Sequence, residues 1–482
     1  MIITVRHMKI LLISANRNTL PLPVMPIGVC MVAEAAERAG HDVRLLDLMF
    51  EREPFTAIGD AVIRFRPEVI GLSVRNIDNN DMHDPVFFLD DLRHLVNAIR
   101  EHTGAPVILG GAALGVMPEA ILRLAGVSCG VVADGEVVFP LLLERISEGE
   151  SFGDVPGIAY LDQDGFNITK CADADESAAC GAPAYGRWLN VPGYRSQLAA
   201  VPVQTKVGCP FRCVYCTYRR IEGGVQRLAD PGDVAGAVQR LAASGLRDIE
   251  FVDSVFNAPQ EHALAVCEEI GRTGRPARLQ SLELNPRAFD DELAAAMKRA
   301  GFVGMGITAD SAADAALAGL GKGFTSSDVH HAAEVVKRHG IPCAWIFLLG
   351  GPGETQETVR ETLRFAERNV LPRDVAFFNV GIRIYPDTEL ASIARREGVL
   401  TVPPQAMLRP VFYVTPQVEA SWIMRELMRS MANHMNFINA DSIGLPFLPT
   451  IHRVAYRLGV RPPLWRHTRR IRRGLRMLGM DV

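Results

Sequence analysis

Three of the nine cysteines stand together in the segment 208–216, Gly-Cys-Pro-Phe-Arg-Cys-Val-Tyr-Cys. Cys209, Cys213 and Cys216 form Cys-x3-Cys-x2-Cys directly after a predicted strand. Three thiolates on one short loop can bind three irons of a [4Fe–4S] cube and leave the fourth iron open to an outside ligand. Zinc is the rival metal, but it usually has four ligands, and no fourth His or Cys lies nearby in the sequence. The spacing therefore predicts an iron–sulfur cluster.

This motif resembles the Cys-x3-Cys-x-aromatic-Cys signature of the radical SAM superfamily, and the resemblance extends from about Val201 to Arg396. It implies that the amino and carboxylate groups of S-adenosylmethionine (SAM) chelate the open iron. Tyr215, the aromatic residue before the third cysteine, would then face the adenine. Asp253, at the end of the second predicted strand, is the candidate acceptor for the SAM ammonium group, which needs a fixed carboxylate or carbonyl nearby. Alternatively, Asp253 caps the following helix.

Two later strand ends carry further motifs. Residues 349–355 read Leu-Gly-Gly-Pro-Gly-Glu-Thr, and residues 381–388 read Gly-Ile-Arg-Ile-Tyr-Pro-Asp-Thr. Both resemble segments of the B12-associated branch of the superfamily, which implies cofactor contacts at Gly350, Gly351, Glu354 and Arg383. Plain strand-to-helix turns are the alternative. Asp310 is a candidate ribose contact, although its Asp-Ser segment departs from the Glu-Ser more usual at that place.

Residues 1–150 alternate short apolar runs with helical segments. Predicted strands cover Lys9–Ser14, His41–Leu46, Val69–Val74, Pro106–Gly110 and Gly130–Ala133. Strands that alternate with helices of this length indicate a parallel, doubly wound sheet, in which ligands bind outside the carboxyl ends of the strands. We therefore expect an α/β fold whose N-terminal domain is a Rossmann-like five-stranded parallel sheet.

A second alternating series follows residues 151–200, which are rich in Gly, Pro, Ala and Asp and are predicted to form a linker. Six predicted strands with helices between them occupy residues 201–396. This pattern indicates a partial (β/α)6 barrel with its chemistry at the strand ends. The strand signal then fades, so residues 397–482 are expected to form a mostly helical C-terminal region with a basic tail.

The N-terminal domain resembles the cobalamin-binding domains that precede radical SAM domains. Small or polar residues follow its predicted strands, where they would admit the corrin ring and the nucleotide tail. The candidate cobalamin contacts are Asn16, Ser73, Arg75, Gly110, Gly111, Gly135 and Glu136. A dinucleotide site is disfavoured because no Gly-x-Gly-x-x-Gly follows the first strand.

Many cobalamin domains carry Asp-x-His-x-x-Gly after the first strand, and that histidine ligates cobalt. Residues 14–20 of this chain read Ser-Ala-Asn-Arg-Asn-Thr-Leu instead, so we expect no protein imidazole below the cobalt. Resemblance to methylating members suggests that residues 75–81 approach the lower face of the corrin. Arg75 would leave the metal uncoordinated there, because a guanidinium keeps its protons. The alternative is an exposed cluster of Arg75 with nearby aspartates.

The composition is that of an ordinary globular chain, with 48% hydrophobic and 22% charged residues among 482. The 51 Lys and Arg nearly balance the 55 Asp and Glu, which disfavours nucleic acid as a partner. No apolar run is long enough to span a bilayer, and the N-terminus has no signal-peptide pattern. The expected location is the cytoplasm.

The C-terminal region contains two further patterns. Met424, Met428, Met431 and Met435 share one helix face, which fits core packing or an apolar substrate pocket. Nine arginines lie between Arg453 and Arg476, with Trp465 and aliphatic residues among them. They form either a solvated basic face or a docking surface for an anionic substrate or for anionic lipid headgroups. Docking on lipid headgroups would make the protein a peripheral membrane protein.

Taken together, the resemblance implies a cobalamin-dependent radical SAM enzyme that uses a [4Fe–4S] cluster, SAM and cobalamin. The favoured activity is C-methylation of an unactivated carbon in a lipid or secondary metabolite, through a 5′-deoxyadenosyl radical and methylcobalamin. An external reductant such as flavodoxin or ferredoxin would supply electrons. Two alternatives stay open. One is a non-methylating radical rearrangement or cyclisation with the same cofactors, and the other is a cobalamin carrier or sensor, against which the cysteine motif argues.

Overall fold

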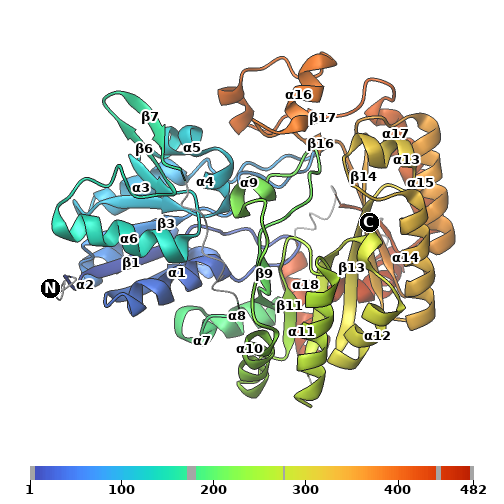
Figure 1. Ribbon diagram of the computed structural model, residues 1–482, viewed down its shortest axis with the longest axis horizontal. Helices are drawn as coiled ribbons and strands as arrows, with labels where there is room; N and C mark the ends of the chain where they lie inside the picture. The colour runs from blue at the N-terminus through green and yellow to red at the C-terminus, as the bar shows by residue number, and fades with distance from the viewer. Residues whose placement is uncertain (1–5, 171–180, 275–276, 441–446, 478–482) are drawn as a thin grey trace.

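Two parallel-sheet units stand side by side in the computed structural model, which describes residues 6–170, 181–274, 277–440 and 447–477 (Figure 1). The N-terminal unit is drawn in blue to cyan, and the second unit runs from green to orange. A small part of the second unit, around α16 (Glu389–Arg396), lies above the junction between the two. The predicted α/β fold class is confirmed.

The N-terminal sheet has the strand order β2-β1-β3-β4-β5-β6-β7. Its strands are β1 (Lys9–Ser14), β2 (Asp42–Asp47), β3 (Val69–Ser73), β4 (Val107–Gly110), β5 (Cys129–Val131), β6 (Ile158–Asp162) and β7 (Gly165–Ile168). The first five are parallel, as predicted, and β6 and β7 add an antiparallel hairpin. Its turn is closed by Asp162 Oδ1, which accepts hydrogen bonds from the backbone N–H groups of Asp164 and Gly165. Part of the predicted linker therefore extends the sheet.

Helices cover both faces of this sheet. They are α1 (Ile27–Arg38), η1 (Leu48–Phe50), α2 (Pro54–Phe65), α3 (Leu92–Arg100), α4 (Ala112–Val116), α5 (Pro118–Ala125) and α6 (Gly135–Glu148). α1 packs against α6, while α2 packs against α3. In β1, Ile10 and Leu12 belong to one apolar cluster and Leu11 and Ile13 to another, as the alternation of side chains in a doubly covered strand requires.

The remainder of the predicted linker contains two short helices, α7 (Tyr185–Trp188) and α8 (Val191–Ser196). Each presents a buried tyrosine to one of the units. Tyr185 donates a hydrogen bond to the carbonyl oxygen of Pro202, and Tyr194 donates one to Asp47 Oδ2, both at 2.7 Å. This segment is therefore packed between the units.

The second sheet has the order β18-β15-β14-β13-β12-β11-β8, and all its neighbouring strands are parallel. Its strands are β8 (Val201–Val203), β11 (Asp248–Phe251), β12 (Arg278–Leu284), β13 (Phe302–Asp310), β14 (Cys343–Leu349), β15 (Val375–Val380) and β18 (Phe437–Asn439). The six predicted strands are present. β18 comes from the region expected to be helical and adds a seventh strand at the edge of the partial barrel.

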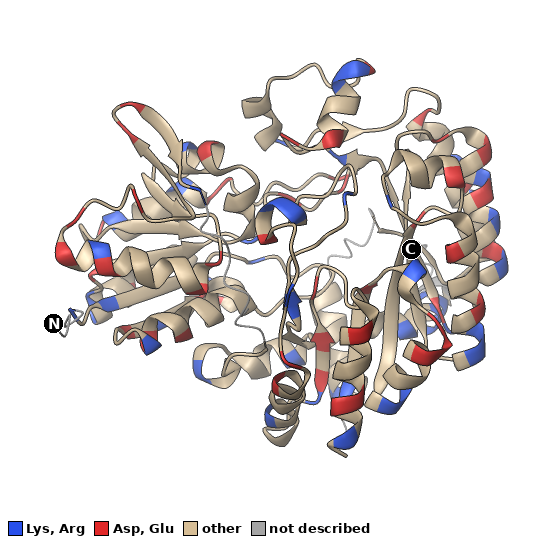
Figure 2. Ribbon diagram, viewed as in Figure 1, with Lys and Arg blue, Asp and Glu red and all other residues tan. Residues whose placement is uncertain are grey.

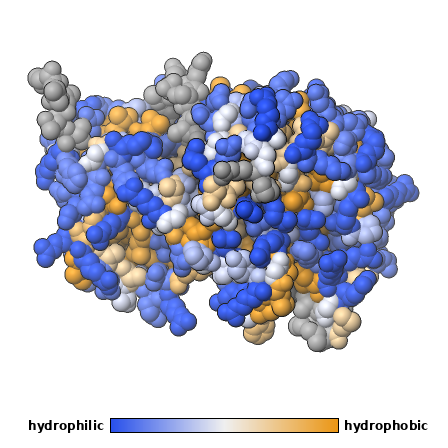
Figure 3. Space-filling view, turned by 90° about the horizontal axis from the view of Figure 1, so that it is seen from below, coloured by the Kyte–Doolittle hydropathy of each residue, from blue (hydrophilic) through white to orange (hydrophobic). Residues whose placement is uncertain are grey.

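Helices surround the outside of the barrel (Figure 1). They are α10 (Pro231–Ala243), α11 (Gln260–Arg272), α12 (Asp291–Ala300), α13 (Asp314–Gly319), α14 (Ser326–His339), α15 (Gln356–Asn369) and α17 (Ala420–Asn433). Basic and acidic residues are interspersed along these helices, in keeping with the balanced charge of the chain (Figure 2). From below, hydrophilic side chains cover most of the surface, and hydrophobic ones form separate patches (Figure 3).

Short elements complete the chain. They are β9 (Lys206–Val207), α9 (Tyr218–Glu222), β10 (Arg227–Leu228), η2 (Pro286–Ala288), β16 (Ile382–Arg383), η3 (Pro404–Leu408), β17 (Phe412–Tyr413), α18 (Leu448–Arg457), η5 (Leu464–His467) and α19 (Thr468–Met477). Among the described residues, no helix is long and apolar enough to cross a membrane.

The basic tail packs against the barrel. The buried Arg472 donates a hydrogen bond to the carbonyl oxygen of Phe437 in β18, and Arg278 of β12 donates one to the carbonyl oxygen of Pro462. Trp465 covers Gly304 so closely that a Cβ there would lie 2.8 Å from the indole ring. Part of the predicted docking surface is therefore a packing element. In the methionine stripe, Met431 is buried but Met428 is 54% exposed, so only part of that face is core.

Candidate active site

The three cysteines lie on the loop between β9 and α9. Gly208 turns the chain away from β9 with a φ of +98°, and a Cβ there would lie 2.1 Å from the carbonyl oxygen of Val225, so only glycine fits. The backbone N–H of Cys209 donates to Gly223 O, and that of Cys216 donates to Cys213 O, both at 3.1 Å. Backbone hydrogen bonds thus fix both ends of the cysteine motif.

The side chains of the three cysteines are wholly or partly buried on this loop. Cys209 is buried, and Cys213 and Cys216 are partly buried. Burial raises the pKa of all three thiols, that of Cys216 to about 12, so a bound metal must stabilise their thiolates. Within the part of the chain that the structure describes, no three His, Cys, Asp or Glu side chains surround a point where one ion could bind. A cube needs no such point, because its cysteines bind different irons.

A buried lysine, Lys322, lies beside this loop. Its Nζ forms an ion pair with Asp310 Oδ2 at 2.8 Å and donates to the hydroxyl of Tyr215 at 3.3 Å. Burial lowers the pKa of Lys322, but the negative charges of Asp310 and Cys213 outweigh this effect and raise it. The ammonium therefore stays charged, and its charge counteracts the rise that burial causes in the pKa of Cys213. Lys322 stabilises the thiolate form of the motif.

Sequence analysis missed Lys322. The signal available was the Gly-Lys-Gly segment, whose two glycines, Gly321 and Gly323, have φ of +67° and +71°. Such a turn after α13 presents the lysine to the cysteine loop, where Val214 N also donates to the carbonyl oxygen of Leu320 at 3.0 Å.

Two carboxylates predicted to contact a cofactor, Asp253 for SAM and Glu354, accept hydrogen bonds from nearby backbone. Asp253 is buried and accepts hydrogen bonds from the backbone N–H groups of Thr205 and Lys206 and from the Thr205 hydroxyl. Glu354 is buried as well, and its Oε2 accepts from the backbone N–H groups of Gly350 and Gly351. These bonds brace two strand-end turns, while Glu354 Oε1 is buried and has no hydrogen-bond partner within the described chain, so a cofactor contact of Asp253 or Glu354 stays a prediction.

Tyr215 and Asp310 are brought together, as expected for one site. The Tyr215 hydroxyl donates to Asp310 Oδ2 at 2.5 Å, while Asp310 Oδ1 is buried and has no hydrogen-bond partner within the described chain. A ribose hydroxyl could satisfy that oxygen. The predicted adenine and ribose contacts therefore lie in one place, directly beside the cysteine motif.

The inside of the barrel is polar near its second and third strands. Ile249 and Phe251 pack in the core, so Glu250 between them points to the opposite side of the sheet. Gln280 Nε2 donates to Glu250 Oε2 at 2.8 Å, and Thr308 donates to Glu283 Oε2 at 3.0 Å. Burial raises the pKa of Glu250 to about 7. Barrel interiors are ordinarily filled by apolar branched side chains. The polar side chains of Glu250, Gln280, Glu283 and Thr308 therefore favour a ligand-binding chamber inside the barrel.

A cavity of about 230 Å³ lies between the two units. It is lined by five of the predicted cobalamin contacts, Ser73, Gly110, Gly111, Gly135 and Glu136, and by Gln204, Val207, Ile221 and Glu222 of the second unit. A Cβ on Gly110 would have no atom within 4 Å, so this glycine leaves space open in the cavity. A Cβ on Gly111 would lie 2.4 Å from Val74 O, so that position requires glycine. The small side chains and the position at the strand ends fit a cobalamin tail.

Asn16 and Arg75 line a neighbouring cavity of about 330 Å³ at the ends of β1 and β3. Arg75 is exposed, and one of the aspartates of the alternative cluster, Asp78, pairs with Arg383. Burial raises the pKa values of Glu250 and Tyr218, and the positive charge of Arg75 lowers them in part. Arg75 therefore lies near the opening of the barrel.

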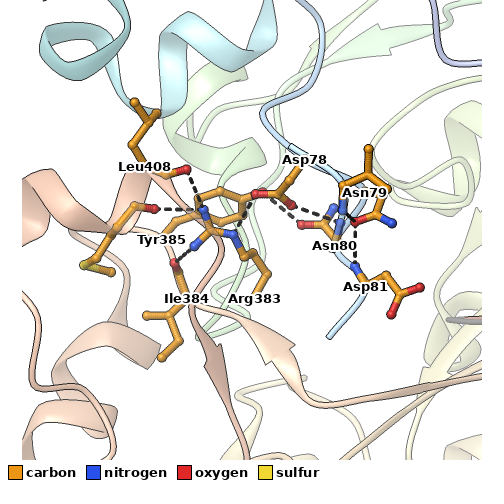
Figure 4. Close-up of polar contacts among 10 residues, drawn as sticks. Asp78, Asn79, Asn80, Asp81, Arg383, Ile384, Tyr385 and Leu408 are labelled. Atoms are coloured by element: carbon orange, nitrogen blue, oxygen red, sulfur yellow. Dashed lines mark hydrogen bonds and ion pairs between the residues drawn. The ribbon is translucent and has the colours of Figure 1, made fainter. Parts of the chain in front are cut away.

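Arg383, predicted as a cofactor contact, lies at the junction between the units instead. Its guanidinium pairs with Asp78 of the N-terminal unit at 2.8 Å, and the two side chains are 2% and 0% exposed. The physical reason is that β16 pairs with β17 outside the barrel sheet, where Asp78 of the N-terminal unit lies within reach of the guanidinium (Figure 4).

Comparisons with known proteins agree with this geometry. Residues 13–143 match the B12 binding domain family model, and residues 203–366 match that of the radical SAM superfamily. A tryptophan 2-C-methyltransferase from Streptomyces laurentii is 27% identical over 453 residues, which cover 80% of this chain and 75% of the relative. An uncharacterized methyltransferase from Pyrococcus horikoshii is 26% identical over 82% of this chain and 84% of its own length.

The fold is also found in a solved structure. The radical SAM methyltransferase TsrM from Kitasatospora setae, described with cobalamin and a [4Fe–4S] cluster bound, superimposes with a TM-score of 0.85 at 24% identity. The match covers 98% of this chain and 99% of TsrM. With both domains matched in the order predicted, this chain belongs to the cobalamin-dependent radical SAM enzymes. Its cofactors are a [4Fe–4S] cluster, SAM and cobalamin.

Proposed function

We propose that this enzyme transfers a methyl group from SAM to an unactivated carbon of a small molecule. The observation that carries the proposal is that the cysteine loop and the cobalamin cavity meet. Ile221 and Glu222, in α9 directly after the loop, line the cavity between the units. Both cofactors, bound at these residues, would thus face one space, as a methyl transfer through cobalamin requires. Methyltransferases among the relatives support the same reaction.

The polar barrel interior suggests the substrate class. Glu250, Gln280 and Glu283 offer hydrogen-bond acceptors inside the chamber. Burying such groups against hydrocarbon would be costly, because they would lose their water without gaining partners. A secondary metabolite with polar groups therefore fits the chamber better than the hydrocarbon part of a lipid does.

The side chains of this protein would bind and orient the cofactors and the substrate. The cofactors, when bound, supply the radical and methyl-transfer chemistry. The three cysteines would hold the cluster, Lys322 would keep the Cys213 thiolate charged, and Tyr215 with Asp310 would hold the nucleoside part of SAM. Gly110 would leave room for the cobalamin tail. An electron donor such as flavodoxin or ferredoxin would reduce the cluster from outside.

The products formed from SAM test this proposal. Methyl donation leaves S-adenosylhomocysteine, whereas reductive cleavage leaves 5′-deoxyadenosine. Chromatography of the reduced holoenzyme with SAM should show S-adenosylhomocysteine, which a purely rearranging or cyclising enzyme would not form. A cobalamin carrier or sensor would form neither. Absence of S-adenosylhomocysteine in a reduced, cobalamin-loaded sample would contradict the proposed methyl transfer.

We also propose that no histidine of the N-terminal unit ligates cobalt. His83 is the histidine of the exposed loop after β3, and His41 is held at the start of β2, where its Nδ1 accepts from Met8 N at 3.3 Å. Alanine variants of all five histidines of this unit should therefore leave the visible spectrum and the cobalt EPR signal of the bound cobalamin unchanged; these are His7, His41, His83, His94 and His102. Loss of a nitrogen hyperfine splitting in any one variant would show that the lower face is coordinated by imidazole.

The exposed arginines of α19 allow a test of peripheral membrane contact. Arg469, Arg470 and Arg473 line a surface cavity together with Arg373 and His467. Each basic residue near an anionic surface contributes about 1 kcal/mol at most, so several together give reversible adsorption. We expect sedimentation with anionic liposomes that weakens with salt, and its loss when Arg469, Arg470 and Arg473 become glutamate. No binding of the native protein at low salt would contradict the membrane contact. Substitution is preferable to truncation because Arg472 and Trp465 pack against the barrel.

A further inference from the structure

A cavity of about 460 Å³ lies at the end of the barrel opposite to the cysteine loop. It is lined in part by Pro342, directly before β14, and by Pro372, shortly before β15. The cysteine loop instead contacts the last residue of β13, because Tyr215 donates to Asp310. The strands are parallel, so the cavity lies at their amino ends and the loop at their carboxyl ends. A seven-residue strand such as β14 separates the two by roughly 20 Å.

The lining of this cavity is strongly basic. Six arginine and histidine side chains from the loop before β15, from η5 and from α19 line it, namely Arg373, Arg466, His467, Arg469, Arg470 and Arg473. No Asp or Glu is among the described residues of the lining. Asp374 Oδ1 lies 3.8 Å from Arg373 Nε, but this buried carboxylate also accepts from the backbone N–H groups of Cys343 and Leu371. Asp374 therefore offsets one of these positive charges at most.

The basic groups of the cavity repel one another. Arg469 and Arg473 are four residues apart in α19 and so share a helix face, where like charges are unfavourable. Burial lowers the pKa of His467, and the positive charges of Arg466 and Arg470 lower it further. An anion bound among these groups would relieve the repulsion.

The helix that carries the arginines is fixed to the barrel. Arg472 is buried and donates a hydrogen bond to the carbonyl oxygen of Phe437, while Trp465 packs over Gly304. The Thr468 hydroxyl donates to the carbonyl oxygen of Trp465 at 2.7 Å and joins η5 to α19. These contacts hold α19 in place, so its basic side chains need little ordering when a ligand binds.

The chemistry of the lining favours phosphate over a carboxylate. Each guanidinium presents a planar fork of N–H donors that matches the oxygens of a phosphate group. A phosphate monoester carries a charge of about −1.5 to −2 and three strong acceptor oxygens, whereas a carboxylate carries one charge and two oxygens. The first turn of α19 adds the positive end of a helix dipole. The volume of the cavity suits a small molecule.

We propose that this basic cavity is a second ligand site, which binds a phosphate monoester or diphosphate group. The inference goes beyond the proposed methyl transfer and does not depend on it. A soluble phosphate ester and a lipid headgroup share this chemistry, and the experiment below distinguishes them. Because the cavity lies at the amino ends of the strands, its ligand is bound away from the cofactors.

The test is isothermal titration calorimetry of the holoenzyme with pyrophosphate. The native protein should bind one equivalent in a saturable manner. The double variant Arg470→Ala/Arg473→Ala should bind it about tenfold more weakly or worse, because charge-assisted hydrogen bonds are lost. Both side chains are exposed, so the variant should fold and keep the iron and cobalamin content of the native protein.

Arg453→Ala/Arg457→Ala is the matched control. It removes the same charge from α18, where both arginines are exposed and neither lines the cavity. This variant should bind pyrophosphate as the native protein does. An equal loss of affinity in the two double variants would overturn the proposal, because it would show a diffuse effect of net charge. Absence of saturable binding at millimolar pyrophosphate would overturn it as well.

Vesicles distinguish the two sources of the phosphate group. Phosphatidic acid ends in a phosphate monoester, whereas phosphatidylglycerol contains only a diester. If the ligand is a lipid headgroup, vesicles with phosphatidic acid should bind more protein than phosphatidylglycerol vesicles of equal surface charge, and pyrophosphate should displace it. If the ligand is soluble, pyrophosphate should bind although the two kinds of vesicle behave alike. Adsorption on both kinds without pyrophosphate binding would support the membrane contact and overturn the ligand site.

Discussion

Replacement of Cys213 by alanine is expected to abolish the brown absorbance at about 400 nm and all cleavage of SAM, because two thiolates cannot retain the cube. The physical basis is the loop between β9 and α9, which presents Cys213 between Cys209 and Cys216 and next to Lys322. Ultraviolet–visible spectroscopy and iron and sulfide analysis after anaerobic reconstitution measure this effect.

Cys267→Ala is the control for this experiment. Cys267 is buried in α11, away from the cysteine loop, and burial raises the pKa of its thiol to about 12, as expected of a cysteine that acts as a small core residue. Its replacement should leave iron content and SAM cleavage unchanged. Full iron content and SAM cleavage in Cys213→Ala would contradict the cluster assignment.

Replacement of Gly110 by leucine is expected to weaken cobalamin binding by about tenfold or more. A Cβ at this position meets no atom of the protein within 4 Å, and Gly110 lines the cavity between the units, so a longer side chain there is expected to extend into that cavity. It should therefore be tolerated in the absence of cobalamin and overpack the site in its presence, at a cost of roughly 1–3 kcal/mol. Titration of the apoprotein with cobalamin, followed by absorbance, measures the affinity.

Gly104→Leu is the matched control in the same unit. A Cβ on Gly104 also has no neighbour within 4 Å, but this residue lies before β4 and does not line the cavity. Its replacement should leave cobalamin affinity unchanged. Equal affinities of the Gly110 and Gly104 variants would show that the cavity is not the cobalamin site.

Strong periodic patterns predicted the central strands well. β1 and β12 coincide with the predicted ranges, because each is a run of apolar or alternating residues bounded by clear turns. The hairpin of β6 and β7 was missed in a segment rich in Gly, Pro, Ala and Asp. Its Asp-Gln-Asp-Gly turn at residues 162–165 was the available signal. β18 is only Phe437–Asn439, too short to carry a period of its own.

The functional site could be predicted only where the residues that act together lie close together in the sequence. The cysteine spacing identified the cluster motif without the fold. Arg383 and Asp253 were assigned from motifs, but their partners, Asp78 and Thr205, lie 305 and 48 residues away in the sequence. Only the fold shows that these partners occupy both side chains. Lys322 was missed for the same reason, since its role depends on Asp310 and the cysteine loop.

The fate of the SAM methyl group tests the central claim most directly. Reduced holoenzyme is incubated with SAM that carries a deuterated methyl group, and the bound cobalamin is then extracted in the dark and analysed by mass spectrometry. The account predicts that the deuterated methyl group is recovered on cobalamin and that Gly110→Leu, with less cobalamin bound, recovers correspondingly less. Bound cobalamin that never acquires the label, in protein with an intact cluster and full cobalamin content, would contradict it.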